Sequence, residues 1–336
     1  MIFKKSGKPV RWAREIIDLS WAYRTSRLVQ VAGTTGIFER LGAGAAAASR
    51  IARDRHLDAA MVEKLLCPLA ALGLVRRAGG KAWKLTPKAA ATMVPAALCY
   101  QGDTLTHSAK VWGFWDDLPN IVRGRRVAYH QDDPMPHEPP RQFGRDLILA
   151  MHNMAMAGRA AELAARVNLK GRRTLMDVGG GPGSYAMALC ERNPHLKATV
   201  FDLPETVKIA RATIARLGMA GRVAAIVGDW NKDEFGRGND AVLLSSIMHG
   251  PDDQAEMKLA KACRALVPGG LLIVQDFLMN ADKTGPLIPA LFNVMVGAFS
   301  LPEMIGRIRA AGFSKIRVKP MPKDAGTTVI TAVKSA

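Results

Sequence analysis

Short apolar runs alternate with segments of helical length throughout the second half of this chain, and this alternation restricts the possible folds more than composition does. Because the runs are apolar at nearly every position, we expect strands that are covered on both faces. Helix-length spacers imply right-handed crossovers between parallel neighbours, so the sequence predicts an α/β fold with a doubly wound parallel sheet. The strands are expected at 174–179, 198–203, 222–230, 240–248 and 271–278. Two last runs, 314–320 and 327–335, are close enough to form a hairpin at one edge.

The first hundred residues predict a separate, mainly helical domain. Apolar residues at helical spacing indicate helices, and residues 73–87 alternate around Gly79 and Gly80 as in a two-stranded hairpin. Asp58 is a good N-cap for the third helix. The helices are expected at Ile16–Leu41, 49–55 and 59–72. Helices followed by a basic hairpin are the arrangement of a winged helix.

The stretch between these two regions predicts a helical connector. Residues 101–140 hold a cluster of aromatic residues, a basic run at 123–126 and a proline-rich loop at 132–140. The segment Phe143–Val167 is rich in Met and Ala and free of proline, so we expect one helix that leads into the sheet domain. The predicted domains are residues 1–100, 101–170 and 171–336.

Composition excludes several classes of protein. Of the 336 residues, 49% are hydrophobic, which is enough for packed cores and excludes an intrinsically disordered chain. With a mean hydropathy of +0.03 and no run of about 18 apolar residues, we expect no membrane span. The basic N-terminus has no apolar core behind it, so we expect no secretion signal and a cytoplasmic protein. The four cysteines lie far apart without a C-x-x-C pair, which predicts core thiols and no metal site.

The net charge of +18 suggests a different class of function, a DNA-binding regulator. Residues 1–100 hold 17 Lys and Arg against 6 Asp and Glu, a net charge of +11. The candidate recognition helix at 59–73, however, has only Glu63 and Lys64 as charged residues and no Asn, Gln or Arg to read bases. The basic residues of the hairpin could touch phosphates or simply form a solvated face. We therefore do not expect nucleic acid as a partner.

Residues 177–183, Asp-Val-Gly-Gly-Gly-Pro-Gly, are the strongest motif, and they lie where the first predicted strand turns into a helix. Glycines let the backbone approach a ligand closely, and the helix N-terminus behind them offers free N–H groups to a carboxylate or phosphate. The dinucleotide fingerprint G-x-G-x-x-G is not met, because Ser184 stands at its last glycine position. The loop predicts a nucleotide-type ligand, with a tight structural turn as the alternative.

Acidic residues end the next two predicted strands. Asp202 ends the second strand, where a carboxylate can accept from the two hydroxyls of a ribose or cap a helix. Asp229 ends the third strand with Trp230 beside it, which places an acceptor and an aromatic wall where an adenine would lie. Because the carboxyl ends of parallel strands meet at one edge of a sheet, the predicted site is the crevice at that edge.

These motifs together resemble a known family. The loop at 177–183, the run NPHLKATVFDLPETV at 193–207, GDW at 228–230 and a histidine just past the fourth strand look like the S-adenosylmethionine-dependent O-methyltransferases of the plant caffeate and bacterial polyketide type. The resemblance extends to FWDDLPNIVRGR at 114–125 and spans nearly the whole chain. It implies a Rossmann-like methyltransferase domain, an N-terminal winged-helix dimerisation domain, a homodimer, and S-adenosyl-L-methionine as the cofactor.

The resemblance also implies which residues bind the cofactor and the acceptor. Gly179 and Gly181 would line the methionine part of the cofactor, and Asp202 would hold its ribose. The remaining cofactor residues would be Leu203, Asp229, Trp230 and Ser245, the last at a position where many relatives have a lysine. The connector and the sheet domain would form a pocket for a small aromatic or apolar acceptor, walled by Met151, Met154, Phe292 and Met295.

His249 matches the general base of the family, and Asp276 matches the acid that orients it. A sulfonium methyl is already a strong electrophile, so the enzyme mainly has to hold the acceptor oxygen in line and remove its proton. Asp276 would fix the tautomer of the imidazole. The resemblance therefore implies methyl transfer to a hydroxyl of an aromatic, quinol or polyketide-like acceptor, as in secondary metabolism. Without the resemblance, a capping or solvent-facing histidine would be the simpler interpretation.

Two positions depart from the pattern of the family. Gly250 and Pro251 follow His249 where relatives have Asp-Trp, and residues 297–300 stand where relatives have a glutamate that contacts the base. These departures keep three alternatives open: a C-methyltransferase, a non-methylating member of the family, and an inactive cofactor-binding dimer partner. A winged-helix DNA-binding regulator is the alternative from another class.

Overall fold

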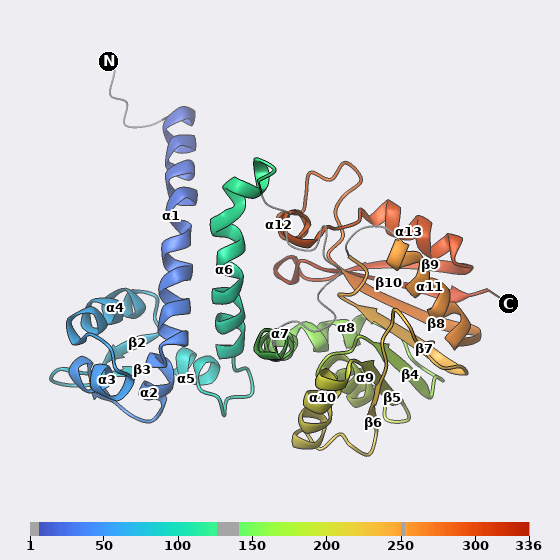
Figure 1. Ribbon diagram of the computed structural model, residues 1–336, viewed down its shortest axis with the longest axis horizontal. Helices are drawn as coiled ribbons and strands as arrows, with labels where there is room; N and C mark the ends of the chain where they lie inside the picture. Colours follow the sequence, from blue (N-terminus) through green and yellow to red (C-terminus); the bar gives the residue numbers. More distant parts are fainter. Residues whose placement is uncertain (1–6, 126–140, 250–252, 336) are drawn as a thin grey trace. The chain divides into compact units, whose positions relative to one another are not determined.

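The structure, a computed structural model, describes residues 7–125, 141–249 and 253–335, and the chain divides into two compact units, Met1–Gly113 and Phe114–Ala336 (Figure 1). The proline-rich loop at 132–140 and the pair Gly250-Pro251 lie outside the described residues. Among the helices of the described chain, none has both the length and the apolar character that crossing a membrane requires. The finer division into 1–100, 101–170 and 171–336 stays a prediction.

The first unit begins with two helices where the sequence predicted one at Ile16–Leu41. α1 spans Lys8–Thr34 and α2 spans Ile37–Gly42. They are separated at Gly36, whose φ of 74° is left-handed and ends the helical path. The prediction of a single helix is wrong, because the helical spacing of apolar residues continues across a glycine that changes the direction of the chain.

The following elements of the first unit agree with the predicted helices and hairpin. Asp58 caps α4 by accepting a hydrogen bond from the Met61 N–H at 2.7 Å. A short strand, β1, pairs antiparallel with β3, so the small sheet has the order β1-β3-β2. The elements are β1 (Ala46–Ala47), α3 (Ala48–Arg55), α4 (Ala59–Ala71), β2 (Val75–Arg77), β3 (Ala82–Leu85) and α5 (Pro87–Met93). The next helix, α6 (Gly102–Val122), begins in the first unit and ends in the second.

Glu63 on α4 joins that helix to the hairpin. Its carboxylate accepts hydrogen bonds from Arg77 Nη2 at 2.5 Å and from Trp83 Nε1 at 3.0 Å. The Arg77 guanidinium also lies 3.7 Å from the centre of the Trp83 ring. Another face of α4 is buried in the core of the unit through Val62, Leu66 and Leu69. One acid of the candidate recognition helix is therefore engaged with the hairpin, and the winged-helix assignment stays a prediction.

The second unit contains an interrupted connector where the sequence predicted one helix at Phe143–Val167. α7 spans Arg141–Met154, the π-helical turn η1 spans Ala155–Arg159, and α8 spans Ala160–Arg166. Inside η1 the backbone leaves helical geometry at Gly158, whose φ is 105°. Because glycine adopts such a φ without steric penalty, the chain breaks the helix there. The prediction of one helix is wrong, although the segment contains no proline.

All seven predicted apolar runs form strands of one sheet. Its order is β6-β5-β4-β7-β8-β10-β9, with parallel pairing from β6 to β8 and antiparallel pairing of β10 with both β8 and β9. The predicted doubly wound sheet and its edge hairpin are confirmed. The strands are β4 (Thr174–Val178), β5 (Lys197–Asp202), β6 (Val223–Val227), β7 (Asn239–Ser245), β8 (Leu266–Asp276), β9 (Phe313–Pro320) and β10 (Thr328–Lys334).

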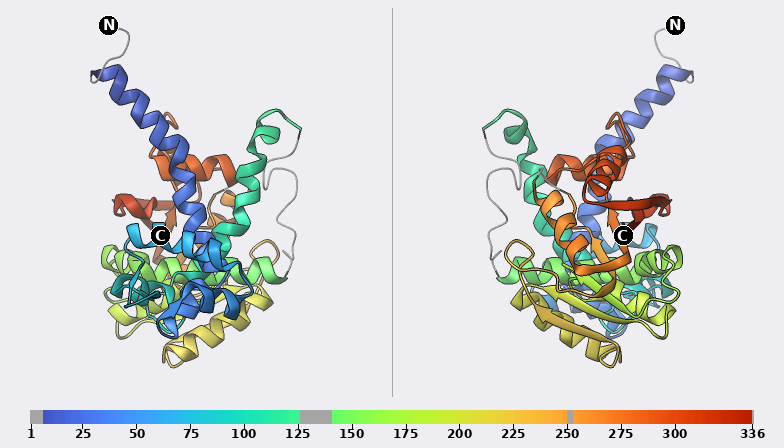
Figure 2. Two further views of the ribbon diagram at one scale, coloured as in Figure 1. Left: turned by 90° about the vertical axis from the view of Figure 1, so that its left-hand side faces the viewer. Right: turned by 90° about the vertical axis from the view of Figure 1, so that its right-hand side faces the viewer.

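Helices cover both faces of this sheet (Figures 1 and 2). On one face α8, α9 (Ser184–Arg192) and α10 (Pro204–Arg216) share a core with Leu243 of β7. On the other face α11 (Asp253–Ala265) and α13 (Leu301–Ala310) share a core with Leu244. The neighbours β4 and β7 lead to opposite halves of the sheet, so their carboxyl ends flank the crevice where such folds bind ligands. Between β8 and α13 the chain forms α12 (Leu287–Val296).

Candidate active site

The carboxyl ends of five parallel strands bring the predicted site residues to one edge of the sheet. The register pairs Val178 of β4 with Leu244 of β7, and Ser245 of β7 with Gln275 of β8, so these strands end at the same level. The residues brought to this edge are the glycine loop after β4, Asp202 at the end of β5, Asp229 after β6, His249 after β7 and Asp276 at the end of β8.

The glycine loop has a backbone conformation that its sequence requires. Gly179, Gly181 and Gly183 have left-handed φ values of 62°, 54° and 79°, which L side chains rarely adopt. Position 180 has no room for a side chain, because a Cβ on Gly180 would lie 2.6 Å from Cγ of Asp177. The loop therefore holds its backbone close over a carboxylate, and Gly183 then starts α9.

Asp177, in the strand ahead of the loop, is completely buried. Neither of its carboxylate oxygens accepts a hydrogen bond of normal geometry from the described residues. Burial, with a further contribution from Asp202, raises the pKa of Asp177 to about 8, against the opposing effect of the Ala186 N–H in α9. A buried acid whose oxygens lack a hydrogen bond of normal geometry fits a site that receives a positively charged ligand, because a nearby cation favours the ionised carboxylate.

Asp202 is also buried, and its carboxylate is fixed by the backbone. Oδ2 accepts a hydrogen bond from the Gly181 N–H at 2.8 Å, and Oδ1 accepts one from the Leu203 N–H at 2.7 Å. Burial raises the pKa of Asp202, and these two hydrogen bonds act in the opposite direction. Asp202, which is predicted with Leu203 to bind the cofactor, therefore ties the end of β5 to the glycine loop.

Trp230 packs against the same loop. A Cβ at Gly179 would lie 2.7 Å from the Trp230 ring and 2.9 Å from Cγ2 of Ile247. The neighbouring Asp229 is half-buried, and its Oδ1 accepts a hydrogen bond from the Asn231 N–H at 2.9 Å. Segments that follow β4, β6 and β7 thus meet at Gly179, where a larger residue than glycine would not fit.

His249 and Asp276 lie together, as the sequence predicts. Nδ1 of the imidazole is 3.3 Å from Oδ1 of the carboxylate, which is itself almost completely buried. The carboxylate also accepts hydrogen bonds from the N–H groups of Met248 at 2.8 Å and Phe277 at 2.7 Å, so its position is fixed by the backbone. The imidazole is 25% exposed, and so it remains accessible.

Two phenylalanines extend from this pair. The Phe292 ring meets the His249 ring edge to face at 4.8 Å, and Phe277 stacks on Phe292 at 4.2 Å with an interplanar angle of 24°. Phe292 lies on α12 and Phe277 directly follows β8. The accessible histidine is therefore bordered by aromatic surface on one side.

The other predicted site residues are placed as follows. Ser245 is buried, and its hydroxyl is 3.0 Å from Oε1 of Gln275, to which it donates. Met151 and Met154 are half-buried on α7, and Met295 is half-buried on α12. Their roles as cofactor and acceptor residues stay predictions.

The structure also contains a buried cluster that sequence reasoning missed. Nδ1 of His152 on α7 is 2.8 Å from the hydroxyl of Ser184, the first residue of α9, and Nε2 is 3.1 Å from the Arg216 guanidinium at the end of α10. Because arginine only donates, Nε2 accepts and Nδ1–H donates to Ser184. Burial and the charge of Arg216 lower the pKa of His152 to about 4. No spacing in the sequence relates these three residues.

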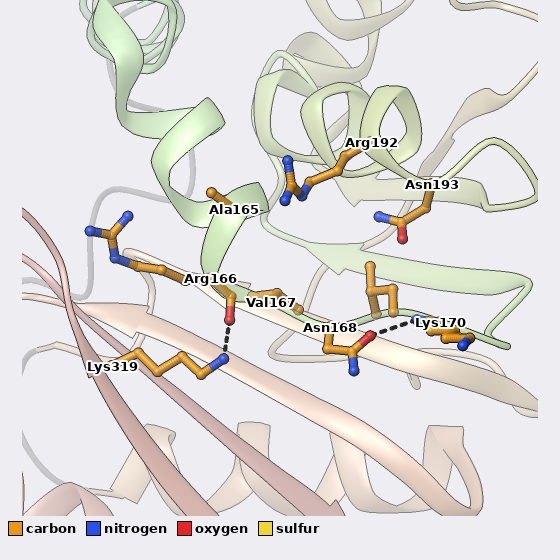
Figure 3. Close-up of a pocket in the computed structure, with 9 residues that line it drawn as sticks. Ala165, Arg166, Val167, Asn168, Lys170, Arg192, Asn193 and Lys319 are labelled. Atoms are coloured by element: carbon orange, nitrogen blue, oxygen red, sulfur yellow. Dashed lines mark hydrogen bonds between the residues drawn. The ribbon is translucent and has the colours of Figure 1, made fainter.

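A hollow of about 430 Å³ is lined by residues other than the predicted site residues (Figure 3). Segment 165–170, Arg192, Asn193 and Lys319 line it, and no predicted site residue is among them. Its polar groups partly satisfy one another, because Lys319 Nζ donates to the Arg166 carbonyl and the Lys170 N–H donates to Asn168. Within the described ranges, no group of three or more His, Cys, Asp and Glu side chains could hold a metal ion.

Comparison with known proteins gives a consistent set of similarities. The model of the O-methyltransferase domain matches residues 142–312. The chain is 32% identical to 3-hydroxy-5-methyl-1-naphthoate 3-O-methyltransferase of Streptomyces sahachiroi, over 95% of each chain. It is 28% identical to the N,N-dimethyltransferase OxyT of Streptomyces rimosus, over 97% of this chain and 98% of that protein. The structure of human N-acetylserotonin methyltransferase in complex with SAM has a TM-score of 0.85 at 21% identity, over 99% of this chain and 100% of that chain.

Proposed function

This chain belongs to the O-methyltransferase family and is an S-adenosylmethionine-dependent methyltransferase, and we propose that it methylates a hydroxyl of a small aromatic, quinol or polyketide-like acceptor with His249 as the general base. The observation that carries the proposal is the accessible imidazole of His249, 3.3 Å from a fixed and buried Asp276, at the sheet edge that also carries the glycine loop. C-methylation is not favoured by any particular observation.

The residues at this edge fit the cofactor. S-adenosylmethionine, when bound, supplies an electrophilic methyl group on a positively charged sulfur. Asp177 offers a buried carboxylate whose oxygens lack a hydrogen bond of normal geometry within the described residues. Gly179 has no room for a side chain beside Trp230 and Ile247, and Gly181 has a left-handed φ of 54°. Asp202 and Leu203 would hold the ribose side, and Asp229, Trp230 and Ser245 complete the proposed binding residues.

In the proposed mechanism His249 removes the proton of the acceptor hydroxyl as the hydroxyl oxygen takes up the methyl group, which would leave S-adenosylhomocysteine as the other product. With Nδ1–H directed at Asp276, Nε2 is left as the acceptor of that proton. Asp276 then stabilises the imidazolium, and its position is fixed by the Met248 and Phe277 N–H groups. A positioned base of this kind contributes about 10²- to 10⁴-fold to the rate.

An aromatic acceptor fits the surroundings of the base. Phe292 and Phe277 offer stacked rings beside His249, and flat π-systems favour such contacts. Met151, Met154 and Met295 would add adaptable apolar walls. The naphthoate O-methyltransferase of Streptomyces sahachiroi acts on a ring system according to its name. So does a phenazine O-methyltransferase of Lysobacter antibioticus, which is 23% identical over 94% of this chain and 95% of that protein.

The first unit is proposed to form a homodimer. Its α1 leaves large apolar side chains half or more exposed, namely Trp12, Ile16, Leu19, Trp21 and Tyr23. Such a row of apolar groups on one helix marks an interaction surface, and a second copy of the same helix is the simplest partner. A role for this unit in dimerisation, not in reading DNA, is consistent with the engagement of Glu63 and Arg77 with each other.

The proposed activity is tested by incubating the protein with S-adenosylmethionine and a panel of phenols, naphthols, quinols and hydroxylated polyketides. Mass spectrometry should find a gain of one CH₂ in at least one acceptor, and proton NMR should place the new methyl on oxygen. A methyl on carbon would replace the O-methyl proposal, and binding of S-adenosylhomocysteine without any methylated acceptor would favour an inactive cofactor-binding partner.

A further inference from the structure

Two lysines of α11 have buried side chains. Lys258 is 4% exposed and Lys261 is 6% exposed, and they lie three residues apart, hence on one face of the helix. Burying an ammonium group carries a free-energy penalty unless it is paired or hydrogen-bonded. Both lysines donate to backbone carbonyls of the proposed active site, and no part of the mechanism above uses them.

Lys258 contacts the segment that carries the base. Its ammonium group donates to the carbonyl of Ile247 at 2.6 Å, two residues before His249. The same ammonium lies 4.9 Å from the centre of the Trp230 ring, within the range of a cation–π interaction. One side chain therefore touches both the segment after β7 and the aromatic residue after β6.

Lys261 contacts the turn after β6. Its ammonium donates to the carbonyls of Trp230 at 2.7 Å and Asp233 at 3.0 Å, and it lies 5.9 Å from the centre of the Phe235 ring. These contacts close the turn that carries Asp229 and Trp230. The two lysines thus hold two different segments from one helix face.

Those two segments meet at the glycine loop. The Trp230 ring and Ile247 Cγ2 lie 2.7 Å and 2.9 Å from the position that a Cβ of Gly179 would take. A shift of either segment would open this contact beside the loop. Lys258 also carries a charge that interacts favourably with Asp276, which partly offsets the lowering of its pKa by burial, to about 8.

We propose that Lys258 and Lys261 are positioning residues, Lys258 for the segment that carries His249 and Lys261 for the turn that carries Trp230. Through them α11 fixes the position of the base and of the adenine side of the cofactor site relative to the glycine loop. The assignment of the two effects to catalysis and to cofactor binding rests on the proposed function.

The test compares Lys258→Met and Lys261→Met, which keep the apolar stem and remove the ammonium group. Lys258→Met should lower kcat by about tenfold to a hundredfold, because a base displaced by a fraction of an ångström loses alignment, and should leave the Kd of S-adenosylhomocysteine within about threefold. Lys261→Met should raise that Kd by about tenfold, with kcat at saturating S-adenosylmethionine near the wild-type value. Arg264→Met is the control: it removes an exposed ion pair between α11 and Glu234 and should change neither quantity, because exposed ion pairs contribute little.

Hydrogen exchange read by mass spectrometry separates this inference from the proposed function. Without any acceptor, Lys258→Met should speed exchange of residues 246–249 by about tenfold or more, and Lys261→Met should do so for residues 229–233. Exchange at wild-type rates in both variants would overturn the inference even if methyl transfer is confirmed. If each variant speeds exchange only in its own segment but the wild type methylates no acceptor, the two contacts are upheld and the proposed function is rejected. Equal losses of kcat and of affinity for S-adenosylhomocysteine in both variants would indicate general destabilisation. That result would also overturn the positioning roles of Lys258 and Lys261.

Discussion

The Nδ1–H of His152 donates to the hydroxyl of Ser184 over 2.8 Å, so a neutral imidazole holds the first residue of the helix that follows the glycine loop. On its other side the imidazole accepts from Arg216, which cannot give up its charge. Protonation of His152 would therefore place two cations in contact in a buried site.

Stability should fall on the acid side of neutrality because of this histidine. Its pKa is about 4 in the folded protein against an ordinary 6.5, so between these values the unfolded chain binds a proton that the folded protein does not. Stability should be lost as the pH falls from 6.5 to 4, by up to about 3 kcal/mol from this group. Urea denaturation of wild type and His152→Gln at pH 7 and pH 4.5 measures it. A wild type that loses no more stability than the variant over this interval would show that His152 is not the source.

Gly180→Ala should destabilise the protein through a clash with Asp177. The new Cβ would lie 2.6 Å from Cγ of that buried carboxylate, and overpacking of this kind costs about 1–3 kcal/mol. Gly221→Ala is the matched control, because its Cβ would meet nothing within 4 Å. Chemical denaturation should show the loss for Gly180→Ala only, and similar curves for the two variants would refute the described packing.

Asp202→Ala should weaken binding of S-adenosylhomocysteine by about tenfold or more, since two backbone N–H groups, one of them in the glycine loop, lose their acceptor. Calorimetry gives the Kd directly. Glu205→Gln, in the exposed first turn of α10, serves as the control and should bind nearly as the wild type does. If Asp202→Ala binds with unchanged affinity, the cofactor does not use this edge of the sheet.

Light scattering should find the wild type as a dimer and the variant Leu19→Glu/Trp21→Glu as a monomer. These side chains are 71% and 54% exposed on α1, so the new charges leave the unit itself intact but oppose burial between copies. Leu98→Glu, at an equally exposed apolar position outside α1, should remain dimeric. A monomeric wild type at micromolar concentration would reject the proposed dimer.

The strands could be predicted from sequence because their burial on both faces leaves a strong apolar signal. The family resemblance predicted His249 and Asp276 as a pair, and they meet because the neighbouring parallel strands β7 and β8 end at the same level. Reasoning from apolar spacing failed for the two long helices, where Gly36 and Gly158 adopt left-handed conformations that an apolar pattern does not record.

Side-chain contacts between distant segments could not be predicted in this way. His152 and Ser184 are 32 residues apart and meet only because α7 packs near the start of α9. Lys258 resembles any solvent-exposed lysine of an amphipathic helix in the sequence, and its burial depends on how α11 lies on the sheet. Contacts of this kind can be identified only once the packing of the helices and strands is known.

Removal of the acceptor proton by His249 is tested by the turnover of His249→Ala at saturating S-adenosylmethionine on an acceptor that the wild type methylates. We expect a loss of at least about a hundredfold with an unchanged Kd for S-adenosylhomocysteine, and a smaller loss for Asp276→Asn. Near wild-type turnover of His249→Ala would show that proton removal does not depend on this imidazole.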